Sequence, residues 1–306
     1  MIEPVTLSIP YYSDPQHLRA AIESVLVQDD DQWQLIVLDD SERDEARKTI
    51  ESMGLAQDPR VQCIQNPRNL GMVGNWNACL DATTTPLGTL LHADDALEPH
   101  YVSMMRDLAT AHPDASAFFC EARIIDAGGQ ERFSFADWIK RFYLPANAIQ
   151  GAPFTLRGED GLRALMAGNF IMCPTLCYRV AALAGRRFDA HYQQVQDLDF
   201  TSRLLMDGDT LVGSRERAYA YRRHANAATA RQSASLLRFD EEFSLFESIS
   251  ARAVRLGWDR AAAVASRKTI IRLHLVYRAM GELLHLRLAG AARCVKRAYH
   301  RGPGRA

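Results

Sequence analysis

Several features that define whole classes of protein are missing from this sequence. Its 306 residues contain no run of about 18 apolar residues, so we expect no membrane-spanning helix. Residues 1–4 are not a basic segment followed by an apolar run, so we expect no secretory signal. Neither sign of charge is in excess, because 36 Lys and Arg face 37 Asp and Glu. A dedicated nucleic-acid-binding protein usually has a basic excess, so we expect no nucleic-acid partner.

Cysteine is also scarce. Of the six cysteines only Cys173 and Cys177 lie close together, and no second Cys or His pair completes a zinc site. We therefore expect reduced, buried thiols in a cytoplasmic protein rather than a disulfide framework. The remaining composition is ordinary, since 47% of the residues are hydrophobic and 24% are charged. These fractions are typical of a soluble globular protein and exclude a disordered chain.

Short apolar runs alternate with helical patterns along the first 111 residues. The runs predict strands at 5–9, 35–38, 60–64 and 87–91, and the patterns predict one helix capped by Asp14 and others at 44–53, 75–82 and 99–111. This alternation is typical of an α/β fold, in which helices cover both faces of a mostly parallel sheet. Ligands of such sheets bind beyond the carboxyl ends of the strands. Polar side chains stand at these ends: Tyr11, Asp39, Asp40, Asn66, Asp94 and Asp95.

The pattern changes after residue 121. Residues 122–157 have no clear periodicity and are rich in aromatic side chains, so they form either an acceptor-binding loop or a small additional core. The sequence then predicts a strand at 170–178, a helix at 197–206, and short strands near 210–212 and 218–221. The last third is helical, with an apolar face over 237–256 and a long helical run from Trp258 to about residue 299.

The sharpest candidate for a functional cluster is His92-Ala93-Asp94-Asp95, which follows the strand predicted at 87–91. Two carboxylates in this place suit a hard cation such as Mg²⁺ or Mn²⁺, which takes further ligands from water and substrate phosphates. A cation there would neutralise charge on a leaving diphosphate. The structural alternative is that one aspartate caps the helix at 99–111, but capping explains two aspartates less well.

Two more carboxylate groups stand at the ends of predicted elements. Asp39 and Asp40 follow the second strand, where a carboxylate can accept hydrogen bonds from a base or a ribose hydroxyl. Asp197 stands at the start of the helix at 197–206, where it can act as general base for a hydroxyl nucleophile. Taken alone, the first pair is better explained as a turn or cap, and the second as a charge that stabilises a helix N-terminus.

Five segments in a fixed order give these clusters a common interpretation. They are Val5-Thr-Leu-Ser-Ile-Pro-Tyr-Tyr12, Ile36-Val-Leu-Asp-Asp-Ser41, Asn69-Leu-Gly71, His92-Ala-Asp-Asp95 and Gln196-Asp197. Over about residues 5–221 the sequence resembles the family 2 glycosyltransferases, whose GT-A fold joins a nucleotide-binding, mostly parallel sheet to an acceptor-binding part. The resemblance implies a catalytic domain at 1–230, with a nucleotide-sugar-binding half (1–121) and an acceptor-binding half (122–230). A helical region, 231–306, would follow.

The resemblance also implies a role for each matching residue. The nucleotide sugar would contact Pro10, Tyr11, Asp39, Asp40, Asn69, Gly71, Asn77, His92 and Asp94. A Mn²⁺ or Mg²⁺ cofactor would be held by Asp95, with Asp94 beside it. Asp197 would deprotonate the acceptor hydroxyl, which attacks the anomeric carbon from the face opposite the diphosphate and inverts its configuration. Arg222 and His224 either contact the diphosphate or belong to a solvated strand end.

The implied substrates are a UDP-, dTDP- or GDP-sugar and a hydroxyl on a glycan, a lipid-linked saccharide or a small molecule. Two residues depart from the family pattern: His92 replaces a common Asp, as a ligand or as a structural histidine, and Gln196 replaces the usual Glu before the base. The Gln-x-x-Arg-Trp motif of the processive polymer synthases is absent from the sequence, as are their transmembrane helices. We therefore expect a single addition.

Two other classes of protein fit part of the pattern. A catalytically silent nucleotide-sugar-binding or scaffold protein with this fold would explain His92 and Gln196, but the presence of Asp94, Asp95 and Asp197 argues against it. A nucleotidyltransferase would need a Gly-rich loop with Arg or Lys after the first strand, to hold a triphosphate. Residues 10–13 are not such a loop.

Residues 267–306 differ in charge from the rest of the chain. They contain ten Lys or Arg and one acid, Glu282, so this segment has a net charge of +9 and the remainder −10. Apolar residues interleave with the basic ones, which predicts a basic amphipathic helix. Such a helix packs on its own catalytic domain, joins a second subunit in a homo-oligomer, or binds the inner face of a membrane as a peripheral contact. The sequence does not decide among these three possibilities.

Overall fold

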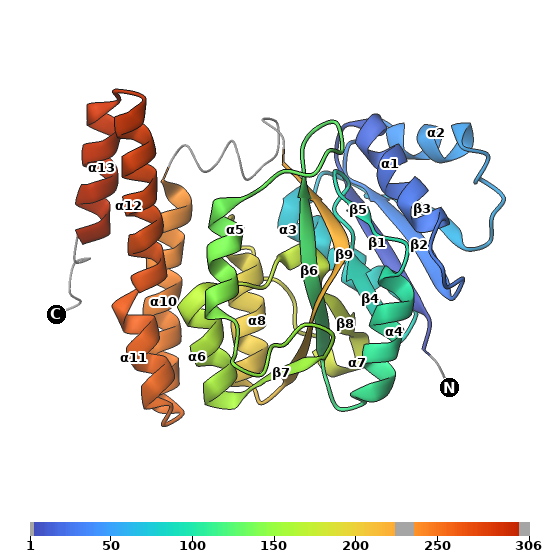
Figure 1. Ribbon diagram of the computed structural model, residues 1–306. Helices are drawn as coiled ribbons and strands as arrows, with labels where there is room; N and C mark the ends of the chain where they lie inside the picture. Colours follow the sequence, from blue (N-terminus) through green and yellow to red (C-terminus); the bar gives the residue numbers. More distant parts are fainter. Residues whose placement is uncertain (1–2, 224–235, 300–306) are drawn as a thin grey trace.

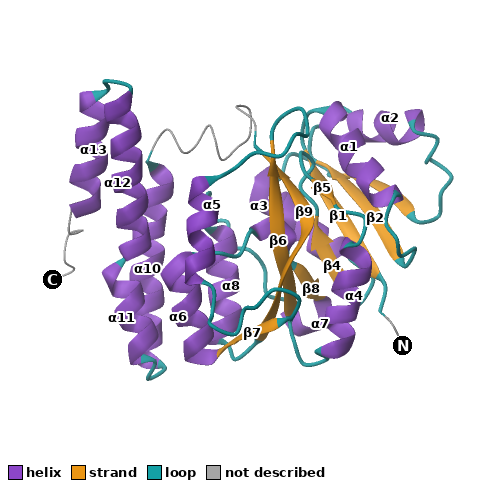
Figure 2. Ribbon diagram, in the orientation of Figure 1, coloured by secondary structure: helices purple, strands orange, loops and turns teal. Residues whose placement is uncertain are grey.

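The computed structural model describes residues 3–223 and 236–299. A central sheet is covered by helices on both faces, and a block of C-terminal helices stands beside this body (Figure 1). Strands and helices alternate over the first half of the chain, whereas the described part of the last quarter is helical (Figure 2). No helix within the two described stretches is both long and apolar enough to cross a lipid bilayer.

Four parallel strands form the first part of the sheet. They are β1 (Val5–Tyr11), β2 (Trp33–Asp39), β3 (Val61–Gln65) and β4 (Leu87–Leu90), in the spatial order β3-β2-β1-β4. The helices are α1 (Pro15–Leu26), α2 (Glu45–Ser52), α3 (Gly71–Ala82) and α4 (Tyr101–Ala111). The elements predicted for the first 111 residues are confirmed, although α3 begins earlier than expected. Asp14 caps α1 by accepting a hydrogen bond from the His17 amide at 3.2 Å.

Alternate side chains of these strands enter two separate cores. Leu7 and Ile9 of β1 belong to the core that includes α1 and α4, and Ile36 and Leu38 of β2 belong to the core that includes α3. All four side chains are at most 4% exposed. The sheet is therefore buried on both faces, as expected of parallel strands.

The second part of the sheet mixes strand directions. β6 (Ala117–Ile125) and β9 (Thr210–Arg222) are parallel to each other, whereas β8 (Cys177–Arg179), β5 (Ala96–Leu97) and β7 (Phe154–Arg157) pair antiparallel with their neighbours. The helices here are α5 (Phe135–Lys140), α6 (Gly158–Gly168), α7 (Val180–Leu183) and α8 (Gln196–Met206). The predicted class, a mostly parallel sheet flanked by helices, is confirmed.

Three predictions for this part need correction. The strand expected at 170–178 is limited to β8 at its end, because Pro174 has no amide hydrogen to donate and Cys173–Thr175 form a 3₁₀ turn. The two strands expected near 210–212 and 218–221 are parts of one strand, β9. Residues 122–157 contain the end of β6, the helix α5 and the strand β7, so they are more regular than expected.

The C-terminal helices are α10 (Leu237–Arg255), α11 (Asp259–Arg267), α12 (Thr269–Leu284) and α13 (Leu288–Tyr299). A single long helix to residue 299 was the wrong expectation. Lys268 (φ 53°) and Leu286 (φ 57°) adopt left-handed backbone conformations, which end one helix and let the next begin. Helix α13 then returns along α12 (Figure 1), and α11 packs on α6. Side chains of α10–α13 share one buried core with α6 and α8, so a boundary at residue 230 stays a prediction.

Candidate active site

A cavity of about 1830 Å³ lies beyond the carboxyl ends of β1 and β4, and helices α3, α8, α10 and α12 contribute to its walls. Eight of the predicted site residues line this one cavity: Pro10, Asp40, Asn69, Gly71, His92, Asp94, Asp197 and Arg222. They come from segments far apart in the sequence. The structure therefore brings together most of the side chains that the sequence singled out.

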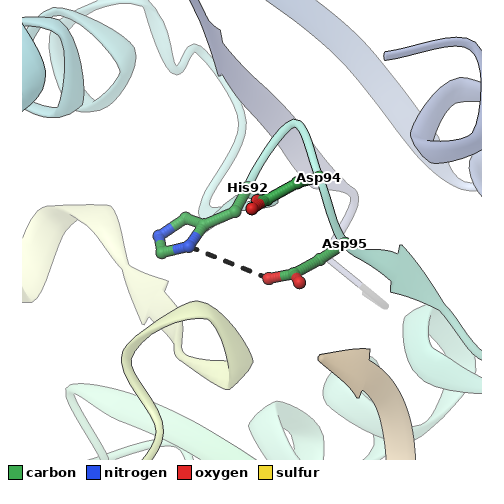
Figure 3. Close-up of side chains that lie close together, drawn as sticks. All are labelled: His92, Asp94 and Asp95. Atoms are coloured by element: carbon green, nitrogen blue, oxygen red, sulfur yellow. Dashed lines mark ion pairs between the residues drawn. The ribbon is translucent and has the colours of Figure 1, made fainter. Parts of the chain in front are cut away.

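The loop between β4 and β5 carries the three side chains that we name the cation cluster: His92, Asp94 and Asp95 (Figure 3). Asp95 is only 1% exposed. Its carboxylate accepts hydrogen bonds from the Tyr219 hydroxyl at 3.0 Å and from the Arg222 amide at 2.7 Å, so β9 fixes its orientation. Burial and the nearby Asp94 carboxylate raise the pKa of Asp95 well above its ordinary value.

His92 occupies a defined position in this cluster. Its ring stacks on Trp76 of α3 with ring centroids 5.1 Å apart, and its Nδ1 lies 3.8 Å from Asp95 Oδ2. Among the described residues, its buried Nε2 atom has no hydrogen-bond partner. Burial lowers the pKa of His92 below its ordinary value, so the ring is neutral near pH 7 and can offer a lone pair.

The cation cluster is a donor set that fits a divalent cation. The ligand atoms of its three side chains all lie within 4.8 Å of one another. This limit is slightly larger than the distance of about 4.2 Å between opposite ligands of a bound Mg²⁺, so small side-chain movements would complete the coordination. Carboxylates suit Mg²⁺ and Mn²⁺, and a neutral imidazole can serve as a further ligand of a divalent metal ion. A cation here would also offset the repulsion between the two carboxylates.

Asp40 holds a loop at the edge of the cavity. Its carboxylate accepts hydrogen bonds from the Leu70 amide at 2.8 Å and the Gly71 amide at 3.0 Å, and Asn69 Nδ2 donates to its backbone oxygen at 3.1 Å. Gly71 has φ 72°, a conformation that glycine adopts without strain. The sequence placed Asp40, Asn69 and Gly71 in one site, and they are in direct contact.

Four of the predicted residues that the structure describes do not line the cavity. One is the buried Asp95 of the cation cluster, and the other three lie behind the lining. Tyr11 is fully buried, and its hydroxyl donates to Glu45 Oε2 at 2.9 Å. Asp39 accepts hydrogen bonds from the amides of Ser41 and Ala46 and so orients the start of α2. Asn77 pairs with the backbone of Phe188 in both directions. These side chains support the site from outside its lining, and Tyr12 lines the cavity next to Tyr11.

Asp197 stands in the first turn of α8 and lines the cavity. Burial raises its pKa above the ordinary value, and the positive charges of Arg238 and Lys140 reduce this rise. Arg238 of α10 donates to Glu242 at 2.9 Å and is itself part of the lining. The sequence did not indicate Arg238 and Glu242 as site residues, because an Arg–Glu pair four residues apart on a helix is a common surface feature.

Arg222 is tied to the cation cluster by several hydrogen bonds. Its Nε donates to the backbone oxygen of Asp94 at 2.7 Å, and its Nη1 donates to the backbone oxygens of Asp126 and Ala127. The guanidinium therefore holds the Asp94–Asp95 loop against β9 while it lines the cavity. His224, the other residue predicted to contact the diphosphate, lies outside the described residues.

One wall of the cavity is largely apolar. It includes Phe135 and Ile139 of α5, and Leu273, Tyr277 and Met280 of α12. Phe135 and Tyr277 have ring centroids 6.0 Å apart, so α5 and α12 meet there. No motif in the sequence indicated that α12 would reach the site. The aromatic composition of residues 122–157 was the signal for α5.

Comparisons with known proteins concern the family and the fold of this chain. The family model described as Glycosyl transferase family 2 matches residues 6–162. An uncharacterized protein of Sinorhizobium fredii, y4gI, is 30% identical over 148 residues. The match covers 47% of this chain and 16% of that protein, so this chain spans only about a sixth of the length of that curated relative.

Two solved structures resemble the whole chain. S. aureus TarS 1–349 in complex with UDP-GlcNAc has a TM-score of 0.66 at 14% identity, over 96% of this chain and 80% of that one. The mannosyltransferase PcManGT from Pyrobaculum calidifontis, in complex with GDP-Man and Mn²⁺, has a TM-score of 0.60 at 13% identity, over 99% and 77%. At such identities the likeness concerns the fold, and it confirms the predicted GT-A type with C-terminal helices.

Proposed function

Because the chain belongs to glycosyl transferase family 2 and has the GT-A fold, we propose that it moves one sugar from a nucleotide-sugar donor to an acceptor hydroxyl, with inversion. One observation carries this proposal. A single cavity is lined both by residues of the cation cluster and by Asp197, whose raised pKa suits a general base. The acceptor is a hydroxyl of a glycan, a lipid-linked saccharide or a small molecule.

The donor would occupy the polar part of the cavity. Pro10, Asp40 and the loop at Asn69 and Gly71 line the cavity and would surround the nucleoside, and His92, Asp94 and Arg222, which also line it, would face the diphosphate. The similar structures with UDP-GlcNAc and GDP-Man support a nucleotide sugar as ligand. A UDP-, dTDP- or GDP-sugar fits this chemistry.

The cation cluster would hold Mn²⁺ or Mg²⁺ through Asp95, Asp94 and His92. When bound, the ion supplies positive charge that stabilises the leaving diphosphate. Arg222, which already bonds to the backbone of Asp94, adds a fixed positive charge beside the same group. The Mn²⁺ in the similar mannosyltransferase structure supports the choice of metal.

Asp197 would take the proton of the acceptor hydroxyl as its oxygen attacks the anomeric carbon. The new carbon–oxygen bond forms on one face of the sugar, and the bond to the diphosphate breaks on the other face. The diphosphate leaves with the electron pair, and the configuration at carbon inverts. A raised pKa makes Asp197 a stronger base than an ordinary aspartate, and base catalysis of this kind typically contributes about 10²–10⁴ in rate.

Donor binding provides a test that does not require the acceptor. We expect that, in the presence of Mn²⁺, one class among UDP-, dTDP- and GDP-sugars raises the midpoint of thermal unfolding, since a ligand of the folded state stabilises it. The Asp94→Asn variant should lose this shift, and Asp160→Asn, at a 67%-exposed side chain outside this cavity, should keep it. If no sugar nucleotide shifts the midpoint with Mn²⁺ or Mg²⁺, the proposed donor site is wrong.

A further inference from the structure

Helix α12 has two apolar faces. On one face Ile271, Leu275 and Ala279 are at most 3% exposed and belong to the main core. On the other face, which we name the outer stripe, Leu273, Tyr277, Met280 and Leu284 are 50%, 51%, 59% and 83% exposed. A surface helix of a globular protein normally has one apolar stripe. The second stripe indicates a surface that a partner covers.

The outer stripe ends in the turn between α12 and α13. There, four leucines form what we name the leucine tip: Leu283, Leu284, Leu286 and Leu288, with exposed fractions of 49%, 83%, 86% and 69%. All residues from 283 to 289 are exposed. The tip is the end of a helical hairpin that stands at the edge of the molecule (Figure 1). Contiguous apolar surface of this kind usually marks a binding site for protein or membrane.

The outer stripe is continuous with the catalytic cavity. Leu273, Tyr277 and Met280 line that cavity, and Leu284 extends the same helix face to the tip. From Leu273 to Leu284 the helix rises by about 16 Å. A surface that covers the tip and the stripe therefore lies next to the apolar wall of the active site.

The helical hairpin that ends in the leucine tip is basic. Residues 267–299 contain eight Lys or Arg and one acid, Glu282. Arg287 stands within the tip and is 69% exposed, and Arg293 and Lys296 are exposed on α13. A second copy of the chain would bring equal charges together, whereas an anionic surface complements them. Leucines flanked by exposed cations are the pattern of an element that lies in the membrane interface.

We propose that the leucine tip and the outer stripe dock on an anionic lipid bilayer. The leucines enter the boundary between headgroups and acyl chains, a layer about 5–10 Å deep for such elements. Arg287, Arg293 and Lys296 face the lipid phosphates. Docking brings the apolar wall of the cavity to the bilayer surface, and it does not depend on which sugar or nucleotide the site binds.

Vesicle flotation tests this proposal. Full-length protein is mixed with vesicles of phosphatidylcholine alone, or with about one-third phosphatidylglycerol, a content that gives a strongly negative surface. We expect flotation with the anionic vesicles, and weaker flotation at high salt because screening reduces the attraction of the cations. The double variant Leu284→Asp/Leu286→Asp should bind at least tenfold more weakly. The matched control Val254→Asp, at a position 59% exposed on α10, should bind like the wild type.

Folding is checked by circular dichroism, and the exposure of Leu284 and Leu286 predicts an unchanged melting curve for the double variant. The donor-induced thermal shift is measured in the same variant, so failure of docking and failure of the donor site are separate results. Absence of flotation by the wild type, or equal flotation by the double variant, overturns the proposal. If the wild type does not float but forms a dimer in light scattering, and the double variant is monomeric, the leucine tip binds a second copy of the chain instead of lipid.

Discussion

At the scale of single residues, two acidic side chains of the site differ in their surroundings. Asp95 is buried and receives hydrogen bonds from β9, whereas Asp197 is half-buried and faces the cavity from the first turn of α8. Burial raises the pKa of both carboxyls. At Asp95, a bound cation would offset the free-energy cost of a buried negative charge. At Asp197, the raised pKa makes the carboxylate a stronger base.

The role proposed for Asp197 predicts how activity depends on pH. A base must be deprotonated, so the rate is expected to fall as the pH decreases through the raised pKa of Asp197, above the ordinary value of about 3.9. The rate of nucleoside diphosphate release, measured across the acidic range, should show this limb in the wild type. In Asp197→Asn the residual rate should not show this fall at acidic pH. If the fall persists in that variant, a group other than Asp197 causes it.

Metal removal is expected to act on donor binding first. Chelation with EDTA should abolish the donor-induced thermal shift, and added Mn²⁺ or Mg²⁺ should restore it, because carboxylates suit both ions. If EDTA leaves donor binding unchanged, donor binding does not require a metal ion.

The residues of the site were predictable where a strand-end motif contained them. Asp40, Asn69, Gly71, Asp94 and Asp197 fall in segments with recognisable order, and the structure places them around one cavity. Tyr11 could have been assigned to the core, because it continues the series of hydrophobic residues at every second position of β1, which begins with Val5 and Leu7. Arg238 and Glu242 were not predictable, since they reach the site from α10 and no motif links α10 to it.

At the scale of elements, two glycines show opposite packing. Gly213 of β9 stands where a Cβ would overlap the rings of Phe119 and Phe154, which pack edge to face with centroids 5.6 Å apart. Gly281 of α12 has open space where its Cβ would be. The first glycine is required by packing, and the second weakens its helix.

Alanine at these two positions should therefore change stability in opposite directions. Gly213→Ala is expected to lower the free energy of unfolding by about 1–3 kcal/mol through overpacking. Gly281→Ala is expected to raise it by about 0.5–1 kcal/mol, the difference in helix propensity between the two residues. Urea denaturation of both variants measures these changes, and equal effects would contradict the described packing.

Elements were predictable where one periodicity dominated. Over the first 111 residues short apolar runs alternate with helical patterns, and every predicted strand and helix is present. The breaks at Lys268 and Leu286 were not predictable, because neither Lys nor Leu favours a left-handed backbone. The burial of small residues on α13, such as Gly290 and Ala291, against α12 stabilises the hairpin that these breaks permit.

At the scale of the whole molecule, the C-terminal helices and the sheet share one core. Leu275 of α12 is fully buried in the same cluster as Phe200 of α8. Leu275→Ala is expected to destabilise the entire chain by about 2–5 kcal/mol, the usual cost of such a deletion. Thermal unfolding followed by circular dichroism and by tryptophan fluorescence should give coincident transitions at a lower temperature. Two separate transitions would show that the helices fold as an independent domain.

The near-neutral charge of the chain is a sum of two opposite parts. Residues 1–266 have a net charge of −10 and residues 267–306 a net charge of +9. The acidic part contains the cation cluster and Asp197, and the basic part contains the hairpin with the leucine tip. Net charge alone therefore excludes only a wholly basic nucleic-acid-binding protein. The distribution of charge places the candidate cation site in the acidic part and the surface proposed to bind anionic lipid in the basic part.

Donor binding and turnover, measured together in Asp197→Asn, distinguish a general base from a donor ligand. The donor chosen by thermal shift is titrated into this variant with Mn²⁺, and the release of nucleoside diphosphate is followed in parallel. We expect donor affinity close to that of the wild type and a turnover at least a hundredfold lower, because the proposed base acts on the acceptor hydroxyl or water and not on the donor. Turnover equal to that of the wild type, in a variant that still binds the donor, would show that Asp197 is not the base.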